Sequence, residues 1–170
     1  MEKRVQMLNS SLTTEIEAGT ERRFLVKYFG IVLGAIVLTA GLGQFLSIYM
    51  AIATTAYITM LFGVVLRKDK SLHMALMSTA MLTDFLLVLA LEFTRSAVNT
   101  AVSFEMSLPQ QAHIGFSTLA VLLYLPILIL GLRRYLAREG GFATRYWHIR
   151  LGVAGLVFRS LGFIFMFSLL

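Results

Sequence analysis

FLVKYFGIVLGAIVLTAGLGQFLSIYMAIATTAYITMLFGVVL, residues 24–66, is an apolar stretch interrupted only by Lys27, Gln44 and small hydroxyl side chains. About 20 helical residues cross a bilayer core, so one helix of this length would be about twice too long. Gly41-Leu42-Gly43-Gln44 is the part of the stretch that suits a turn. We therefore predict two membrane spans here, at residues 24–42 and 46–66.

Three further apolar segments predict spans at residues 72–94, 111–132 and 147–169. With 58% hydrophobic residues, the chain exceeds the roughly 45–50% of a soluble domain. Its 170 residues hold about five spans and short loops, with no room for a soluble domain. We predict an all-α polytopic membrane protein in which residues 24–170 form one five-helix domain in contact with the lipid bilayer.

Residues 1–23 are polar and carry Val5, Leu8, Leu12 and Ile16 at helical spacing. This pattern is compatible with a helix that lies on the membrane surface, and equally with a frayed polar tail. We expect no cleaved signal peptide, because no small-residue cleavage site follows a short apolar core.

The positions of Lys and Arg predict the orientation, because cytoplasmic loops are enriched in both. With five spans, Arg95 alone falls on the far side of the membrane. The near side carries Lys3, Arg4, Arg22, Arg23, Lys27, Arg67, Lys68, Lys70, Arg133, Arg134, Arg138, Arg145 and Arg150. We predict a cytoplasmic N-terminus. The net charge of +6 thus reflects orientation, and we expect no nucleic-acid partner.

Two charges at the middle of predicted spans are the main functional signal. Asp84 and Arg159 each follow a histidine by eleven residues, a rise of about 16 Å in a helix. Tyr124 on the fourth span shares their depth. Charges at membrane depth are costly and normally face a partner inside the protein. We predict an Asp84–Arg159 ion pair in an intramembrane polar centre that includes Tyr124. Structural and functional roles for this pair stay open.

The three histidines are candidate metal or haem ligands. His73 and His148 share the near rim, and two imidazoles at one depth suit a metal or haem iron. His113 lies near the far rim, level with the acidic residue Glu92, which suits a cation or a proton relay. Each histidine is also typical of a plain interfacial anchor. The nine methionines suit packing more than copper binding, although Met74 and Met77 lie beside His73.

Rows of small residues predict close helix packing. Ser47, Ala51, Thr55, Thr59 and Gly63 recur every four residues in the second span. Small side chains let helix backbones approach within a membrane. The first span offers Gly30 and Gly34 for the same purpose, and glycines at 152, 155 and 162 surround Arg159 in the fifth.

Catalytic signatures are not evident in the sequence. It lacks Cys, which excludes disulfides and thiolate metal sites, and it has no H-E-x-x-H, phosphate-binding glycine loop or Ser-His-Asp pattern. We therefore expect a non-enzymatic protein.

Three segments resemble a bacterial membrane family catalogued as domain of unknown function four-twenty, which includes a factor that matures haem-copper cytochrome oxidases. Its spans carry H-R-x-x-M, H-I-x-L-A and H-R-x-x-A-R patterns. The corresponding segments are residues 72–77 (LHMALM), 112–115 (AHIG) and 146–152 (YWHIRLG). By motif, the resemblance carries over His73, His113 and His148. The chain departs from the family at Phe45-Leu46-Ser47, where asparagines are usual, and at Leu91-Glu92, where Tyr and His are usual.

The resemblance implies a non-enzymatic accessory role in respiratory-complex biogenesis at a bacterial cytoplasmic (inner) membrane, with haem or copper as the possible cofactor. The residue pattern alone indicates a buried polar centre. It leaves two alternatives open: a small proton or ion channel or transporter that uses Asp84, Arg159, Glu92 and His113, and a structural subunit of a larger membrane complex.

Overall fold

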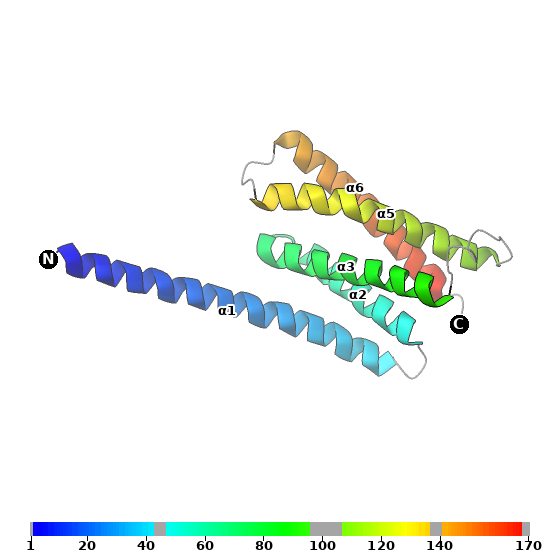
Figure 1. Ribbon diagram of the computed structural model, residues 1–170, viewed down its shortest axis with the longest axis horizontal. Coiled ribbons are helices and arrows are strands. Elements are labelled where there is room, and N and C mark those ends of the chain that lie inside the picture. The colour runs from blue at the N-terminus through cyan, green and yellow to red at the C-terminus, as the bar shows by residue number, and fades with distance from the viewer. Residues whose placement is uncertain (1, 43–46, 96–106, 137–140, 168–170) are drawn as a thin grey trace.

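The computed structural model describes residues 2–42, 47–95, 107–136 and 141–167. These residues form five α-helices and no strand: α1 (Glu2–Leu42), α2 (Ile48–Val65), α3 (Lys70–Arg95), α5 (Leu108–Leu136) and α6 (Phe142–Phe167). Each helix contains a stretch long and apolar enough to cross a membrane. The predicted all-α architecture with five membrane-spanning helices is therefore confirmed (Figure 1).

The helices begin and end close to the predicted spans, and local capping explains two of the starts. Ser47 accepts a hydrogen bond from the Met50 amide at the start of α2, and Asp69 accepts one from the Leu72 amide at the start of α3. These bonds satisfy amides that the helix itself leaves unpaired. Residues 43 and 44 of the predicted turn, and residues 96–106 between the third and fourth predicted spans, lie outside the described residues.

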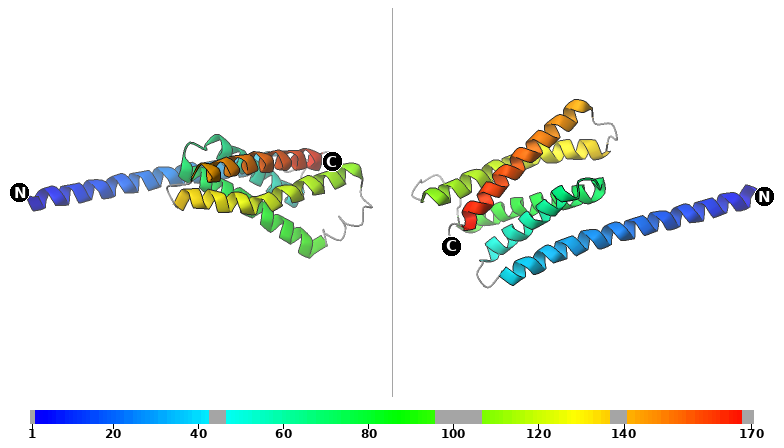
Figure 2. Two further views of the ribbon diagram at one scale, coloured as in Figure 1. Left: turned by 90° about the horizontal axis from the view of Figure 1, so that it is seen from above. Right: turned by 180° about the vertical axis from the view of Figure 1, so that it is seen from behind.

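The first helix is longer than its apolar span. α1 runs without interruption from Glu2 to Leu42, so its polar and apolar parts form one rod. The N-terminal half of the rod projects beyond the other four helices (Figures 1 and 2). The span within it extends over Glu17–Gly41. The predicted position of residues 1–23 on the membrane surface stays a prediction.

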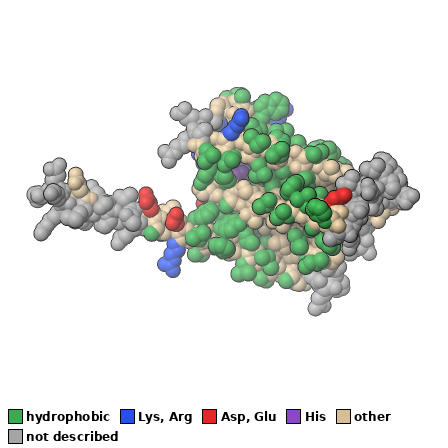
Figure 3. Space-filling model, in the orientation of Figure 1, with side chains coloured by type: hydrophobic (Ala, Val, Ile, Leu, Met, Phe, Trp, Pro, Cys, Tyr) green, Lys and Arg blue, Asp and Glu red, His purple; other side chains and the backbone are tan. Residues whose placement is uncertain are grey.

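The outer surface of the bundle is apolar. Large hydrophobic side chains such as Phe29, Leu122 and Val153 are more than half exposed. Such a surface is unfavourable in water and matches lipid, so this is a multi-pass membrane protein. In Figure 3 hydrophobic side chains cover the body, and the visible Lys and Arg lie toward the end from which α1 projects. We call that end, where α2 and α3 connect, the basic face, and the other end the opposite face. Which of them faces the cytoplasm stays a prediction.

Two antiparallel helix pairs build the bundle. α5 packs along α6, and α2 packs along α3, while α1 lies against α2 and α3 (Figures 1 and 2). Hydroxyl groups join α1 to α3 and α2: Tyr28 Oη lies 2.6 Å from Thr79 Oγ1, and Thr55 Oγ1 donates to Thr39 Oγ1. The two pairs meet each other less extensively, through α3 with α5 and α2 with α6.

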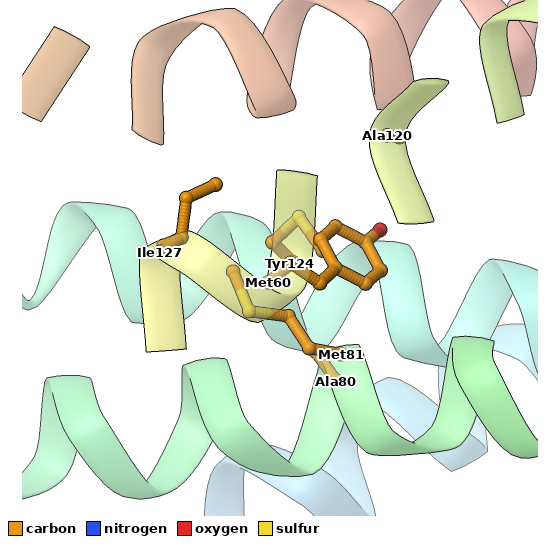
Figure 4. Packing of buried hydrophobic residues seen from close by; sticks show 6 residues of the cluster. All are labelled: Met60, Ala80, Met81, Ala120, Tyr124 and Ile127. Carbon is orange, nitrogen blue, oxygen red and sulfur yellow. The ribbon is translucent and has the colours of Figure 1, made fainter. Parts of the chain in front are cut away.

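Buried apolar side chains fill part of the joint between the two pairs (Figure 4). The members of this apolar cluster are Met60, Ala80, Met81, Ala120, Tyr124 and Ile127. They come from α2, α3 and α5. Within each helix they lie near its middle or between its middle and the basic face. The cluster therefore closes the centre of the bundle toward the basic face.

Glycines allow close packing at three places. A Cβ at Gly63 would lie 3.0 Å from Met77 Sδ, at Gly155 3.0 Å from Ile127 Cδ1, and at Gly162 2.6 Å from Ser117 Oγ. Gly30 and Gly34 have open space around the same position, so their predicted role in helix packing within this chain is wrong. Small residues permit a close approach between helices but provide little attraction of their own.

We expect Gly162→Ala to lower stability, because the new Cβ would also lie 3.2 Å from the backbone nitrogen of Ser117, which cannot rotate away. The overpacking cost should be about 1–3 kcal/mol. Gly152→Ala is the matched control on the same helix, because nothing lies within 4 Å of its added carbon. Thermal unfolding in detergent measures both variants. Equal midpoints for the two would contradict the close contact between α5 and α6.

Candidate functional site

Asp84 of α3 and Arg159 of α6 form the predicted ion pair. Arg159 Nε donates to Asp84 Oδ2 at 2.7 Å, and Arg159 Nη2 donates to Oδ1 at 2.8 Å. The paired geometry is the strong, bidentate form of an arginine–carboxylate contact. Asp84 and Arg159 are only 4% and 5% exposed. The two charges thus satisfy each other inside the bundle, as the matched depths in the sequence predicted.

Two further contacts connect the ion pair to α5 and α2. Tyr124 of α5 donates its hydroxyl to Asp84 Oδ2 at 2.8 Å, which confirms that it belongs to the polar centre. Arg159 Nη2 also donates to the Ala53 carbonyl of α2 at 3.1 Å. Tyr57 of α2 donates to Ser160 of α6 beside the pair. Four helices therefore contribute to one polar network, and the network holds the two helix pairs together.

A cavity of about 280 Å³ lies next to the ion pair. Its lining comes from four helices and from Ser47, and every lining residue lies between the middle of its helix and the opposite face. The lining residues are Ser47, Tyr49, Met50, Ala53, Asp84, Leu87, Val88, Leu91, His113, Ser117, Val121, Arg159 and Met166. The cavity thus lies in the half of the bundle toward the opposite face and reaches the two buried charges. On the other side, the apolar cluster closes the bundle.

Each of the three histidines is turned toward a glycine near the end of its antiparallel neighbour. His73 Nδ1 lies 2.7 Å from the Gly63 carbonyl of α2, and His113 Nδ1 lies 2.7 Å from the Gly162 carbonyl of α6. A carbonyl oxygen only accepts, so both Nδ1 atoms carry the proton. His148 Cε1 lies 3.2 Å from where a Cβ at Gly131 would be, and its buried Nδ1 lies near the backbone of Ile127 without a hydrogen bond of good geometry among the described residues.

The structure separates the predicted site residues into two groups. Asp84, Arg159 and His113 line the cavity, and Tyr124 bonds to Asp84 at its inner end. His73 and His148 lie in the first two turns of α3 and α6, at the basic face, and do not line this cavity. Glu92 is half-buried near the end of α3 and is not a lining residue. Its pairing with His113 stays a prediction.

The described part of the chain contains no cluster of three or more His, Cys, Asp or Glu able to hold a metal ion. Met77, one of the two methionines beside His73, packs against Gly63 of α2. The haem or copper hypothesis therefore depends on the histidine pattern of the resemblance and on the loosely held Nδ1 of His148.

Ser117 is a cavity residue that the sequence analysis missed. Its Oγ is buried and has no hydrogen-bond partner among the described residues. Its place was visible as the step from His113 to Ser117 on one helix face, but a serine in an apolar helix usually bonds to its own backbone. The structure places this residue at the cavity wall, with its hydroxyl packed against Gly162 of α6.

Compared with protein-family models, with curated proteins and with solved structures, the chain has no match in any of the three. The resemblance to the four-twenty family therefore stays a hypothesis carried by the three histidine segments.

We expect Asp84→Asn and Arg159→Gln each to lower stability by about 3–5 kcal/mol, because each change leaves the other charge buried and unpaired. The double variant should lose clearly less stability than the sum of the losses in the two single variants. Unfolding of the two single variants and the double variant in the same detergent measures this coupling. Strictly additive losses would show that the two side chains act on unrelated surroundings.

Proposed function

We propose that this chain is a small membrane transport protein that moves protons or small ions by way of the Asp84–Arg159 centre. The observation that carries the proposal is the cavity that reaches both charges. An ion pair that only fastens helices gains nothing from such a cavity, because water beside the pair weakens its Coulomb attraction. Ionisable groups inside membranes commonly mark ion pathways and proton relays.

A cavity in one half of the bundle and a packed apolar cluster in the other suit a transport cycle. The cavity ends at the ion pair, and the apolar cluster lies beyond it. Transport requires the two helix pairs to shift so that the centre opens to the basic face. Their limited mutual contact favours such a movement, in the way that transporter halves rock around a central site.

The proposal places the protein in a bacterial cytoplasmic membrane with the basic face in the cytoplasm, supported by the uneven distribution of Lys and Arg. The cavity then opens away from the cytoplasm.

We expect proton flux into vesicles to be blocked by a thiol reagent at one position of the cavity. The chain has no Cys, so an introduced one is unique. Val121→Cys places a thiol on the cavity wall, and Ala120→Cys places one next to it in the apolar cluster. A membrane-impermeant methanethiosulfonate should stop flux, read with an enclosed pH dye, in Val121→Cys and leave Ala120→Cys active.

Two exposed positions define the side of access in the same vesicles: Lys68→Cys marks the basic face and Ser107→Cys the opposite face. Val121→Cys should react with reagent supplied on the Ser107 side only. Flux no higher than in protein-free vesicles, or a Val121→Cys thiol as inert as that of Ala120→Cys, would contradict the proposal and favour a purely structural subunit.

A second candidate function is the non-enzymatic role in haem-copper oxidase biogenesis that the resemblance implies, with the larger membrane complex as partner. The specific observation in its favour is that the buried Nδ1 of His148 makes only a loose contact, with the backbone of Ile127, and no hydrogen bond of good geometry among the described residues. Imidazole nitrogens are common metal ligands, and the His73 ring lies near that of His148.

This second candidate predicts that the protein purified from a haem-producing host has a Soret band, or bound copper by elemental analysis. His73→Ala or His148→Ala should remove the signal. A colourless and metal-free preparation would rule out the cofactor-dependent form of this role.

A further inference from the structure

A few polar atoms at the cavity have hydrogen-bonding capacity to spare, and the first of them belong to the ion pair. Asp84 Oδ1 accepts from Arg159 Nη2, and Oδ2 accepts from both Arg159 Nε and Tyr124. The carboxylate is therefore largely occupied. Arg159 uses Nε and Nη2 in these bonds and in the bond to Ala53, so its Nη1 has two donors left among the described contacts. The centre consequently offers donors to a ligand and little acceptor capacity.

Histidine and serine on α5 complete the polar side of the cavity. His113 Nδ1 donates to the Gly162 carbonyl, so Nε2 of the neutral ring is an acceptor. Ser117 lies one turn further along the helix, and its buried Oγ has no partner among the described residues. Both side chains line the cavity together with Arg159. The polar wall thus combines a fixed cation and a base, and the Ser117 hydroxyl is packed against Gly162 directly beside them.

The remaining cavity wall is apolar. Leu87, Val88 and Leu91 of α3 face Val121 and Met166 across it. The volume of about 280 Å³ is far larger than the ~30 Å³ that one water molecule occupies in the liquid. A ligand with one polar end and a short hydrocarbon tail matches this division between a polar wall and an apolar wall.

We infer that the cavity binds a short-chain monocarboxylic acid together with its proton. One carboxyl oxygen accepts from Arg159 Nη1, and the proton lies between the other oxygen and His113 Nε2. The Ser117 hydroxyl rotates away from Gly162 to donate to the carboxyl group. The tail lies on the apolar wall. This inference rests on the proposed transport function and names its substrate class.

Charge balance favours the acid with its proton over either ion alone. The titratable or charged groups lining the cavity are Tyr49 of α2, Asp84 of α3, His113 of α5 and Arg159 of α6. Asp84 and Arg159 neutralise each other, so an anion alone would bury an unbalanced negative charge. A metal cation would find the oxygens of Asp84 already bonded. A carboxylate that brings a proton to His113 leaves the site neutral.

Butyrate is a suitable probe, with the protein in nanodiscs and empty nanodiscs as the blank for partition into lipid. Equilibrium dialysis of radiolabelled butyrate should show saturable binding. Calorimetry in two buffers of different ionisation enthalpy should show that a proton is taken up with each butyrate near neutral pH. Butylamine, with the same tail and the opposite charge, should not compete.

Variants distinguish a loss of butyrate binding from a loss of the fold. His113→Gln keeps a donor for the Gly162 carbonyl but lacks the base, so affinity should fall about tenfold, equivalent to about 1.4 kcal/mol, and proton uptake should disappear. Ser117→Ala should weaken binding, whereas Thr118→Val removes the neighbouring exposed hydroxyl and should leave it unchanged. Leu91→Trp narrows the cavity and should also weaken butyrate binding. This variant replaces His113→Gln in the test if His113→Gln fails to fold.

The inference is overturned if butyrate binds no better than to empty nanodiscs, or if Thr118→Val weakens binding as much as Ser117→Ala. Thiol-blocked proton flux without butyrate binding would leave the transport function standing and show the substrate class to be wrong. Absence of both flux and binding would overturn the two proposals together.

Discussion

The bidentate contact between Asp84 and Arg159 is the interaction on which the structure depends. Within a membrane, apolar side chains gain little by packing against each other instead of against lipid, so buried polar contacts have a larger share in holding helices together. Here the two antiparallel pairs meet through limited surfaces, and the ion pair, Tyr124 and the Ala53 carbonyl join them at one depth. The same contact that joins the pairs also places two charges where a ligand can reach them.

The position of the cavity follows from the way the joint is filled. Toward the basic face, Met60, Met81 and Ile127 occupy the space between the pairs. Toward the opposite face, the side chains that line the cavity do not fill the space between the pairs. Gly162 lets α5 and α6 approach closely there, which brings the hydroxyl and the imidazole beside the arginine. The asymmetry between the two halves is what makes transport a better explanation than a structural pair alone.

Local patterns in the sequence determine much of this arrangement. The five spans were predictable because apolar length is a local property, and the contacts of Asp84, Arg159 and Tyr124 were predictable because equal depth restricts which residues can meet. The wrong expectation for Gly30 and Gly34 has a physical reason: their small size permits a close contact, while the partner helix is set by interactions elsewhere. The histidine–glycine contacts and Ser117 depend on how antiparallel helices face each other, which spacing along one helix does not reveal. The extension of α5 past Arg133 was missed because long cationic side chains can stay helical and reach the membrane surface.

The most direct measurement of the central contact is a solid-state NMR distance in lipid bilayers between the carboxyl carbon of Asp84 and the guanidinium nitrogens of Arg159. Asp69 and Asp84 are the only aspartates, so Asp69→Asn, which keeps a capping oxygen at the start of α3, leaves one labelled aspartate carboxylate. Labelled arginine nitrogens should then dephase its carboxyl signal strongly, as N–O contacts of 2.7 and 2.8 Å require, and Arg159→Gln should abolish the effect. A carboxyl signal that arginine nitrogens do not dephase would contradict the ion pair. It would also contradict the polar contact between the two helix pairs, the position of the two charges at the cavity and the proposed function.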